Sequence, residues 1–235
     1  LENNPEDVPQ AQASRWSGLA TRSASAAVLA LVFLAVLWKG GWIFTWFILM
    51  AALMMMREWN NLTEHKGSLW RFAGLFYVSI PCASLIWLRN VHFLENPQAG
   101  MWLVLYLIII VSITDIGAYF TGRQVGGPRL APVISPNKTW AGLGGGMVSA
   151  AVAGGICHLF TPYPVQLISC VVLGMALAFV AQMGDLFESW MKRDAGVKDS
   201  GTLIPGHGGL LDRIDGLVFT LPVFAAGVAI SGLVL

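Results

Sequence analysis

The side chains that could do chemistry are concentrated in one stretch, residues 185–215. Six of the thirteen acidic residues lie there, together with four of the fourteen basic ones. Hard divalent cations bind carboxylate oxygens, and Mg²⁺ typically takes one or two of them together with the phosphate groups of a substrate. Lys and Arg would then bind the remaining phosphate charge. The stretch therefore predicts metal-assisted chemistry on a phosphorylated substrate.

The spacing of these residues places them on two helix ends. If the apolar helix before residue 185 continues, one of its faces carries positions i, i+3, i+4 and i+7. These are Asp185, Glu188, Ser189 and Lys192. Asp212 and Asp215 begin the next apolar run, near the positive amino-terminal end of a helix. Glycines in the intervening "SGTLIPGHGG" would let backbone N–H groups approach a ligand closely.

Two interpretations of these charges stay open. A solvated or ion-paired role suits several of them as well as a catalytic one: Glu188, Arg193, Asp194 and Lys198. Asp185 could likewise pair with Lys192. However, Asp185 follows about twenty apolar residues, and acids at membrane depth are by default functional. We therefore expect Asp185 to be functional and favour Asp212 and Asp215 as ligands.

A second polar patch lies within residues 115–139. Asp115 is deep in an apolar run, Arg123 precedes a Gly-Gly turn, and Lys138 precedes a glycine-rich apolar segment. A lysine near a helix start can bind phosphate as a point charge, so this patch could contact substrate. Arg123 and Arg129 could instead bind anionic lipid headgroups. The glycines of "GLGGG" are more typical of close helix packing than of a nucleotide loop.

These residues must be positioned by membrane-spanning helices. Of the 235 residues, 56% are hydrophobic and only 11% are charged, whereas soluble domains have about 25% charged residues. A spanning helix needs about 20 mostly apolar residues. We predict an all-α fold, a polytopic integral membrane helical bundle with about seven transmembrane helices. The candidate spans are 23–38, 41–56, 72–88, 101–121, 140–160, 165–187 and 216–235. The first two, separated by "KGG", could form a tight helical hairpin.

The distribution of Lys and Arg predicts the orientation of the bundle. Cytoplasmic loops of membrane proteins carry the excess of these residues. Twelve of the fourteen lie in the amino-terminal tail and in alternate connections, and only Lys39 and Arg89 lie in the others. We therefore expect a cytoplasmic N-terminus, with the long polar loops 122–139 and 188–215 on the cytoplasmic face of the cell's inner membrane.

The chain divides into a polar tail over 1–22, transmembrane helices over 23–100, and a catalytic transmembrane region over 101–235. We interpret the tail as mobile or as the remainder of a trimmed or engineered terminus. The net charge of +1 indicates no nucleic-acid partner. The three isolated cysteines are typical of small buried hydrophobic residues: Cys82, Cys157 and Cys170.

The motifs of the 184–215 stretch resemble those of the phosphatidate cytidylyltransferase (CDP-diacylglycerol synthase) family. The family signature is a Ser, a Lys-Arg pair, a Lys-Asp pair, a His-Gly-Gly and an Asp-Arg-x-Asp. The matching residues are Ser189, Lys192-Arg193, Lys198-Asp199, His207-Gly208-Gly209 and Asp212-Arg213-Ile214-Asp215. "DIGAYFTGR" and "SPNKTWAG" are similar to two further family blocks. The chain departs from the family at Ala141, where members often have an acid, and at Asn137, where they often have a Lys.

The resemblance implies that CTP and phosphatidate react to give CDP-diacylglycerol and pyrophosphate. It implies Mg²⁺ as the cofactor, with Asp185 and Asp212 as the first ligands. Asp215 would support them or hold a second cation. The resemblance also implies membrane lipids as partners and a homodimer.

The resemblance further assigns the phosphate and nucleotide contacts. Lys192 and Arg193 would contact phosphate, and Ser189 would orient the metal or a phosphate. His207 would donate a hydrogen bond rather than act as a base. The other substrate-binding residues would be Asp115, Arg123, Lys138, Lys198, Gly208, Gly209 and Arg213.

Two other functions stay open from the sequence. A CTP-dependent lipid-alcohol kinase shares the membrane, the cation and the nucleotide, but it would release CDP instead of pyrophosphate. A membrane transporter could also use carboxylates such as Asp115 and Asp185 within the membrane. Transporters favour sites at the bilayer midplane and internal repeats, whereas here the charges gather toward one face and no repeat is visible.

Overall fold

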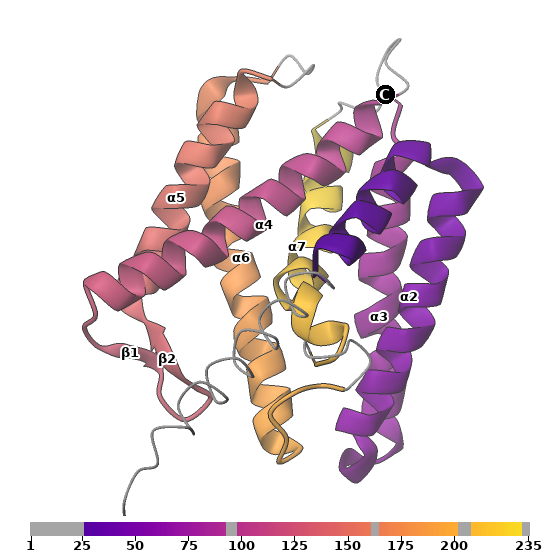
Figure 1. The fold of residues 1–235 in the computed structure, drawn as a ribbon, viewed down its shortest axis with the longest axis vertical. Coiled ribbons are helices and arrows are strands. Elements are labelled where there is room, and N and C mark those ends of the chain that lie inside the picture. Colours follow the sequence, from indigo (N-terminus) through magenta and orange to yellow (C-terminus); the bar gives the residue numbers. More distant parts are fainter. Residues whose placement is uncertain (1–25, 93–97, 161–164, 202–207, 232–235) are drawn as a thin grey trace, which may run out of the picture.

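A computed structural model describes residues 26–92, 98–160, 165–201 and 208–231 (Figure 1). In this part of the chain six helices are long and apolar enough to cross a membrane. The described part of the first predicted span, the helix Ala26–Lys39, is shorter than a full span. The all-α polytopic prediction is confirmed, and the chain is a multi-pass membrane protein.

The six long helices extend beyond most of the predicted spans. They are α2 (Gly41–Leu62), α3 (Ser68–Arg89), α4 (Ala99–Gln124), α5 (Trp140–His158), α6 (Leu167–Asp194) and α7 (Leu211–Ile230). Hydropathy marks only the apolar part of a helix, whereas backbone hydrogen bonding continues into polar sequence. The predicted loop 188–215 therefore contains the last turns of α6 and the first turns of α7. The charged residues at these ends stand on helices.

The predicted loop 122–139 contains a β-hairpin that the sequence analysis did not predict. Strands β1 (Arg129–Ala131) and β2 (Ser135–Thr139) pair antiparallel. Pro132 in the turn and Pro136 in β2 disfavour a helix here. The hairpin ends at Thr139, whose hydroxyl accepts a hydrogen bond of 3.0 Å from the Gly142 backbone N–H and so caps α5. Lys138, one residue earlier, is thereby placed beside the start of α5.

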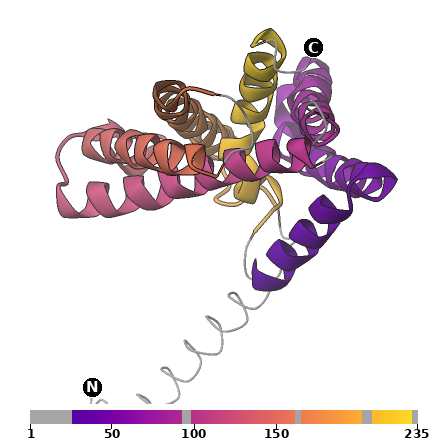
Figure 2. The same ribbon diagram turned by 90° about the horizontal axis from the view of Figure 1, so that it is seen from above.

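Small residues bring α4 and α5 close together. A Cβ added to Gly145 would collide with the Thr121 side chain, and one added to Gly146 would lie 3.0 Å from the Thr114 carbonyl oxygen. The two helices run side by side with α4 tilted across the bundle (Figures 1 and 2). The predicted packing role of "GLGGG" is confirmed.

A buried arginine joins the first two helices to α3. The Arg89 guanidinium donates hydrogen bonds of 2.7 Å to the Leu37 carbonyl and 3.2 Å to the Trp38 carbonyl. These carbonyls lie at the carboxyl end of the helix Ala26–Lys39, where backbone acceptors lack helical partners. The chain turns into α2 at Gly40, which has a φ of 63° and no room for a Cβ beside the Arg89 side chain.

The charged connections gather at one end of the bundle. The short helix η1 (Glu64–Lys66), the β-hairpin, the carboxyl end of α6 and the start of α7 lie there, and the Lys39–Gly40 turn lies at the other end (Figure 1). Seen from above, α7 lies between α6 on one side and α3 on the other (Figure 2). The bundle thus brings the two predicted polar patches to the same end.

Candidate functional site

Asp212, in the first turn of α7, accepts four hydrogen bonds. Its Oδ1 accepts one of 2.7 Å from Lys192 Nζ. Its Oδ2 lies 2.8 Å from the backbone nitrogen of Ser200, 3.0 Å from the Ser200 hydroxyl and 2.8 Å from the backbone nitrogen of Gly209. Asp212 therefore joins α6, the segment after α6 and the start of α7.

Glu58, near the end of α2, makes a second group of contacts at the same place. Its Oε1 accepts a hydrogen bond of 2.8 Å from the Leu210 N–H, and its Oε2 accepts one of 2.9 Å from the Leu211 N–H. The Ser200 hydroxyl lies 3.2 Å from Oε2. Because only 5% of Glu58 is exposed, water contributes little to satisfying this carboxylate.

Lys192 links two carboxylates on neighbouring helices. Its ammonium lies 2.7 Å from Asp212 and 3.3 Å from Glu188 Oε1. Glu188 is 2% exposed, and neither of its carboxylate oxygens has a hydrogen-bond partner among the described residues. The pairing of Asp185 with Lys192 that the sequence left open is therefore replaced by pairs with Glu188 and Asp212.

Asp185 pairs instead with the β-hairpin. Lys138 Nζ lies 2.5 Å from Asp185 Oδ2, and the Ser189 hydroxyl donates a hydrogen bond of 3.3 Å to Asp185 Oδ1. The two polar patches of the sequence thus meet through an ion pair. Ser189 orients the Asp185 carboxylate one helical turn away, as the i, i+4 spacing predicts.

Asp115 and Asp215 extend the group of charges onto α4 and α7. Asp115 interacts electrostatically with Asp185 and Lys138, and Asp215 interacts with Asp185, Asp115 and Glu188. Asp215 accepts a hydrogen bond of 2.7 Å from the Gly216 N–H. We call the five carboxylates and two ammonium groups that these ion pairs, hydrogen bonds and longer-range charge interactions connect the charged cluster: Asp115, Asp185, Glu188, Asp212, Asp215, Lys138 and Lys192.

The other residues predicted to contact substrate are not part of this cluster, and two of them donate hydrogen bonds to residues outside it. Arg123 is exposed and donates to the Tyr119 hydroxyl at 2.8 Å, and Arg193 is exposed and donates to the Val197 carbonyl at 3.2 Å. Lys198 and Arg213 are exposed at the same end. Gly208 has a φ of 82°, and the backbone of its neighbour Gly209 is bound by Asp212. His207 lies outside the described residues.

The chemistry of the charged cluster fits a hard cation, although its side chains are not arranged around one. Five carboxylates share only two ammonium groups, and among the described residues the buried oxygens of Glu188 make no hydrogen bond beyond the ion pair with Lys192. Among the described residues, no three His, Cys, Asp or Glu side chains form a ready-made metal site. Asp212 in particular would exchange hydrogen bonds for a metal bond.

Asp194, the last residue of α6, forms ion pairs with two residues of η1. It lies 2.6 Å from Lys66 Nζ and 2.9 Å from His65 Nε2. The Lys66 ammonium also lies over the rings of Trp70 and Trp190, at 4.3 and 4.4 Å from their centroids. These contacts fix the end of α6 against the α2–α3 connection.

The sequence analysis missed Glu58 and Ser200. Glu58 follows the apolar run of α2 almost directly, so the argument from membrane depth that selected Asp185 applies to it equally. Ser200 carries no such signal, because its role depends on two carboxylates that are 142 and 12 residues away in the chain.

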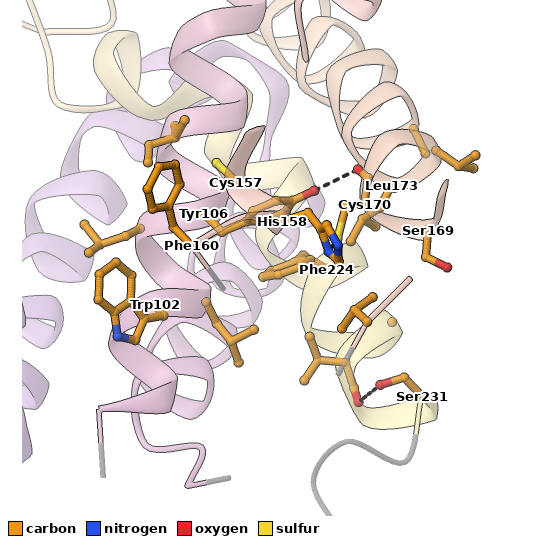
Figure 3. A pocket seen from close by; sticks show the side chains of 18 of the residues that line it. Trp102, Tyr106, Cys157, His158, Phe160, Ser169, Cys170, Leu173, Phe224 and Ser231 are labelled. Atoms are coloured by element: carbon orange, nitrogen blue, oxygen red, sulfur yellow. Dashed lines mark hydrogen bonds between the residues drawn. The ribbon is translucent and has the colours of Figure 1, made fainter. Parts of the chain in front are cut away.

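An apolar cavity of about 840 Å³ lies at the opposite end of the bundle (Figure 3). Its lining includes Trp102, Tyr106, Phe160 and Phe224. The Tyr106 hydroxyl donates a hydrogen bond of 3.1 Å to the Cys170 carbonyl oxygen. No residue of the charged cluster lines this cavity, so it is separate from the candidate site.

Comparison with known proteins identifies the family. A family model described as "Cytidylyltransferase family" matches residues 68–231. A phosphatidate cytidylyltransferase of Brucella suis is 46% identical over 167 residues, which are 71% of this chain and 58% of the relative. One of Haemophilus influenzae is 41% identical over 165 residues, 68% of this chain and 57% of the relative. One of Rickettsia bellii is 35% identical over 195 residues, 80% of this chain and 81% of the relative.

The match covers α3 to α7 and every described residue of the charged cluster. The chain spans 58% of the length of the Brucella relatives. Since the family model matches well over half of the chain, this protein belongs to the cytidylyltransferase family.

Proposed function

We propose that the chain is a phosphatidate cytidylyltransferase, which converts CTP and phosphatidate to CDP-diacylglycerol and pyrophosphate. The observation that carries this proposal is the meeting of the signature residues. Ser189, Lys192 and Asp212 come from opposite sides of a long connection, yet they lie in one cluster at one end of the bundle. The names of the relatives support the same reaction.

In the proposed reaction, a phosphate oxygen of phosphatidate attacks the α-phosphorus of CTP. The bond from this phosphorus to the bridging oxygen breaks, and pyrophosphate leaves with the bonding electrons. The attacking phosphate is already ionised near neutral pH, so no general base is needed. Catalysis of this kind depends mainly on positioning and on charge stabilisation.

The cationic side chains divide into two roles. Arg193 and Lys198 are exposed beside the charged cluster, where they can bind phosphate groups. Lys192 is 13% exposed and engaged by two carboxylates. We propose that it mainly fixes Asp212, and that Lys138 does the same for Asp185.

We propose Mg²⁺ as the cofactor, held by Asp185 and Asp212, with Asp215 supporting them or holding a second cation. The excess of carboxylates over ammonium groups and the burial of Glu188 and Asp212 at one place support this assignment. When bound, the ion would neutralise charge on the transferring phosphate and on the leaving pyrophosphate.

We propose that the charged end of the bundle faces the cytoplasm of the inner membrane. Of the Lys and Arg residues in the described part of the chain, all except Lys39 and Arg89 lie toward this end, as expected for the cytoplasmic side. CTP is a soluble nucleotide and phosphatidate is a lipid, so their meeting place must be at a membrane surface. The homodimer implied by the resemblance also belongs to this proposal, and mass measurement in detergent tests it.

Product analysis tests the proposed reaction. Reconstituted protein is incubated with phosphatidate, Mg²⁺ and CTP labelled in the cytidine. We expect labelled CDP-diacylglycerol and an equal amount of pyrophosphate. Release of CDP with a phosphorylated lipid would replace the proposal with the kinase. Solute movement across liposomes without a cytidylylated lipid would replace it with the transporter.

A further inference from the structure

We propose that Glu58 is a positioning residue of the active site, supplied by a helix outside the region that the family model matches. The matched region begins at residue 68, whereas Glu58 lies in α2. The expected effect on turnover rests on the proposed function. The hydrogen bonding of Glu58 in α2 to the start of α7 does not depend on that function.

Glu58 acts on α7 through the first N–H groups of that helix. The first four N–H groups of a helix have no partner within it. No residue at the start of α7 provides a side-chain cap, and the Leu210 and Leu211 N–H groups bind the two oxygens of Glu58 instead. A carboxylate at this position also interacts favourably with the helix dipole. Glu58 therefore serves as the amino-terminal cap of a helix that follows it by more than 150 positions.

Glu58 also acts on Asp212 through Ser200. The Ser200 hydroxyl lies 3.2 Å from Glu58 and 3.0 Å from Asp212, and its single proton can be donated to only one of them at a time. The Ser200 backbone N–H binds Asp212 as well. The two carboxylates therefore share the Ser200 hydroxyl, and a shift of one changes the hydrogen bonding of the other.

The glycines at this point leave room for the arrangement. A Cβ on Gly209 would lie 2.7 Å from both Glu58 oxygens, and a Cβ on Gly201 would lie 2.9 Å from Oε1. The glycines near the Asp-Arg-x-Asp motif thus allow the backbone to approach a carboxylate of the protein itself. Sequence reasoning had assigned this close approach to a ligand.

Glu58 should affect the proposed reaction through the positions of two carboxylates on α7. Asp212 and Asp215 stand on the first turns of α7, and their positions depend on where this helix begins. A displacement of about 1 Å in an active site can reduce the rate about a hundredfold. Replacing Glu58 should therefore reduce turnover, although Glu58 makes no direct hydrogen bond to Asp212 and acts through Ser200, Leu210 and Leu211.

The test compares Glu58→Gln and Glu58→Ala with Glu64→Gln, which removes an exposed acid from the same end of the bundle. Gln retains one oxygen acceptor and Ala retains none. We expect kcat per folded molecule to fall about tenfold in Glu58→Gln and about a hundredfold in Glu58→Ala. The KM for phosphatidate should remain unchanged in both Glu58 variants. The control variant Glu64→Gln should keep the kcat of the wild type. A lower melting temperature with unchanged kcat would overturn the inference, because it would leave Glu58 a purely structural role.

A double-mutant cycle tests the link through Ser200. If Glu58 acts through this hydroxyl, Glu58→Gln and Ser200→Ala together should reduce kcat by less than the product of the two single effects. For the control pair, Glu64→Gln and Ser200→Ala, the reduction in kcat of the double variant should equal the product of the two single reductions. A multiplicative result for the Glu58 pair would overturn the proposed route.

Amide hydrogen exchange separates this inference from the proposed function. Exchange at Leu210 and Leu211 should be faster in Glu58→Gln than in the wild type and unchanged in Glu64→Gln. If the wild type makes no CDP-diacylglycerol, the proposed function fails, but faster exchange still supports the cap. Unchanged exchange in Glu58→Gln overturns the cap whatever the activity.

Discussion

At the scale of single residues, Asp212 is a carboxylate of the proposed site that also makes structural contacts. Its four hydrogen bonds come from Lys192, Ser200 and Gly209. A group with this many donors is held in one orientation, and its charge is balanced mainly by Lys192. A substitution that preserves its shape but removes its charge therefore tests both roles at once.

We expect Asp212→Asn to lose at least about a hundredfold in kcat/KM for CTP while it remains folded. Asn retains one oxygen acceptor, but its NH₂ group must face a donor. The cost should be about 1–3 kcal/mol of unfolding free energy, which most folded proteins tolerate. Turnover of labelled CTP and thermal unfolding in detergent measure the two effects. Full activity would remove Asp212 from the site.

Lys138→Met tests the ion pair between the hairpin and α6. The variant retains an unbranched apolar side chain but leaves Asp185 without the ammonium group that lies 2.5 Å away. We expect kcat/KM for CTP to fall about ten- to a hundredfold, which corresponds to the loss of a charge-assisted contact of about 1.5–3 kcal/mol. Lys39→Met, an exposed lysine at the opposite end, is the control. Equal activity of the two variants would contradict a role for Lys138.

At the scale of helices, two neighbouring glycines of α5 allow the effect of helix–helix packing on stability to be measured separately from the effect of helix propensity. Gly144 and Gly145 are neighbours in the helix, but a Cβ on Gly144 meets nothing within 4 Å, whereas one on Gly145 collides with Thr121. Alanine favours a helix by about 1 kcal/mol relative to glycine. The two positions should therefore respond to the same substitution in opposite directions.

We expect Gly144→Ala to raise the unfolding temperature slightly, and Gly145→Ala to lower it by several degrees, because α4 and α5 must move apart. Overpacking of this kind typically costs about 1–3 kcal/mol. Thermal unfolding of the two variants in the same detergent gives the comparison. If both variants are stabilised, α4 and α5 leave room for a Cβ at position 145, and the close contact with Thr121 is contradicted.

Much of the helical fold could be predicted, because apolar length and lysine placement follow from the membrane itself. Hydropathy ends the sixth span at residue 187, because "FESWMKRD" is polar. The helical spacing of the charged residues allowed for a longer helix, and α6 does continue to Asp194. The hairpin was missed because its strands are short, three and five residues, and β2 contains a proline. The signature residues were located by type and spacing, but their partners were not. Glu58 and Lys138 meet them only through the tertiary fold.

At the scale of the whole molecule, the bundle has one charged end and one apolar end. This asymmetry predicts a fixed orientation in the membrane. Single cysteines placed at Lys198 and Lys39, in a background without the three native cysteines, should differ in their reaction with a membrane-impermeant thiol reagent. In inverted vesicles we expect labelling at position 198 and protection at position 39. The reverse pattern would place the charged end outside the cell.

The apolar cavity at the far end has a consequence for the search for inhibitors. Ser169 lines it, and Asp185 is sixteen residues further along α6, which is about 24 Å of helix. A drug-sized molecule that fills this cavity therefore cannot reach the charged cluster. Inhibitors selected for this apolar cavity should leave the proposed CTP site free, and a competitor of the proposed nucleotide has to be sought at the other end.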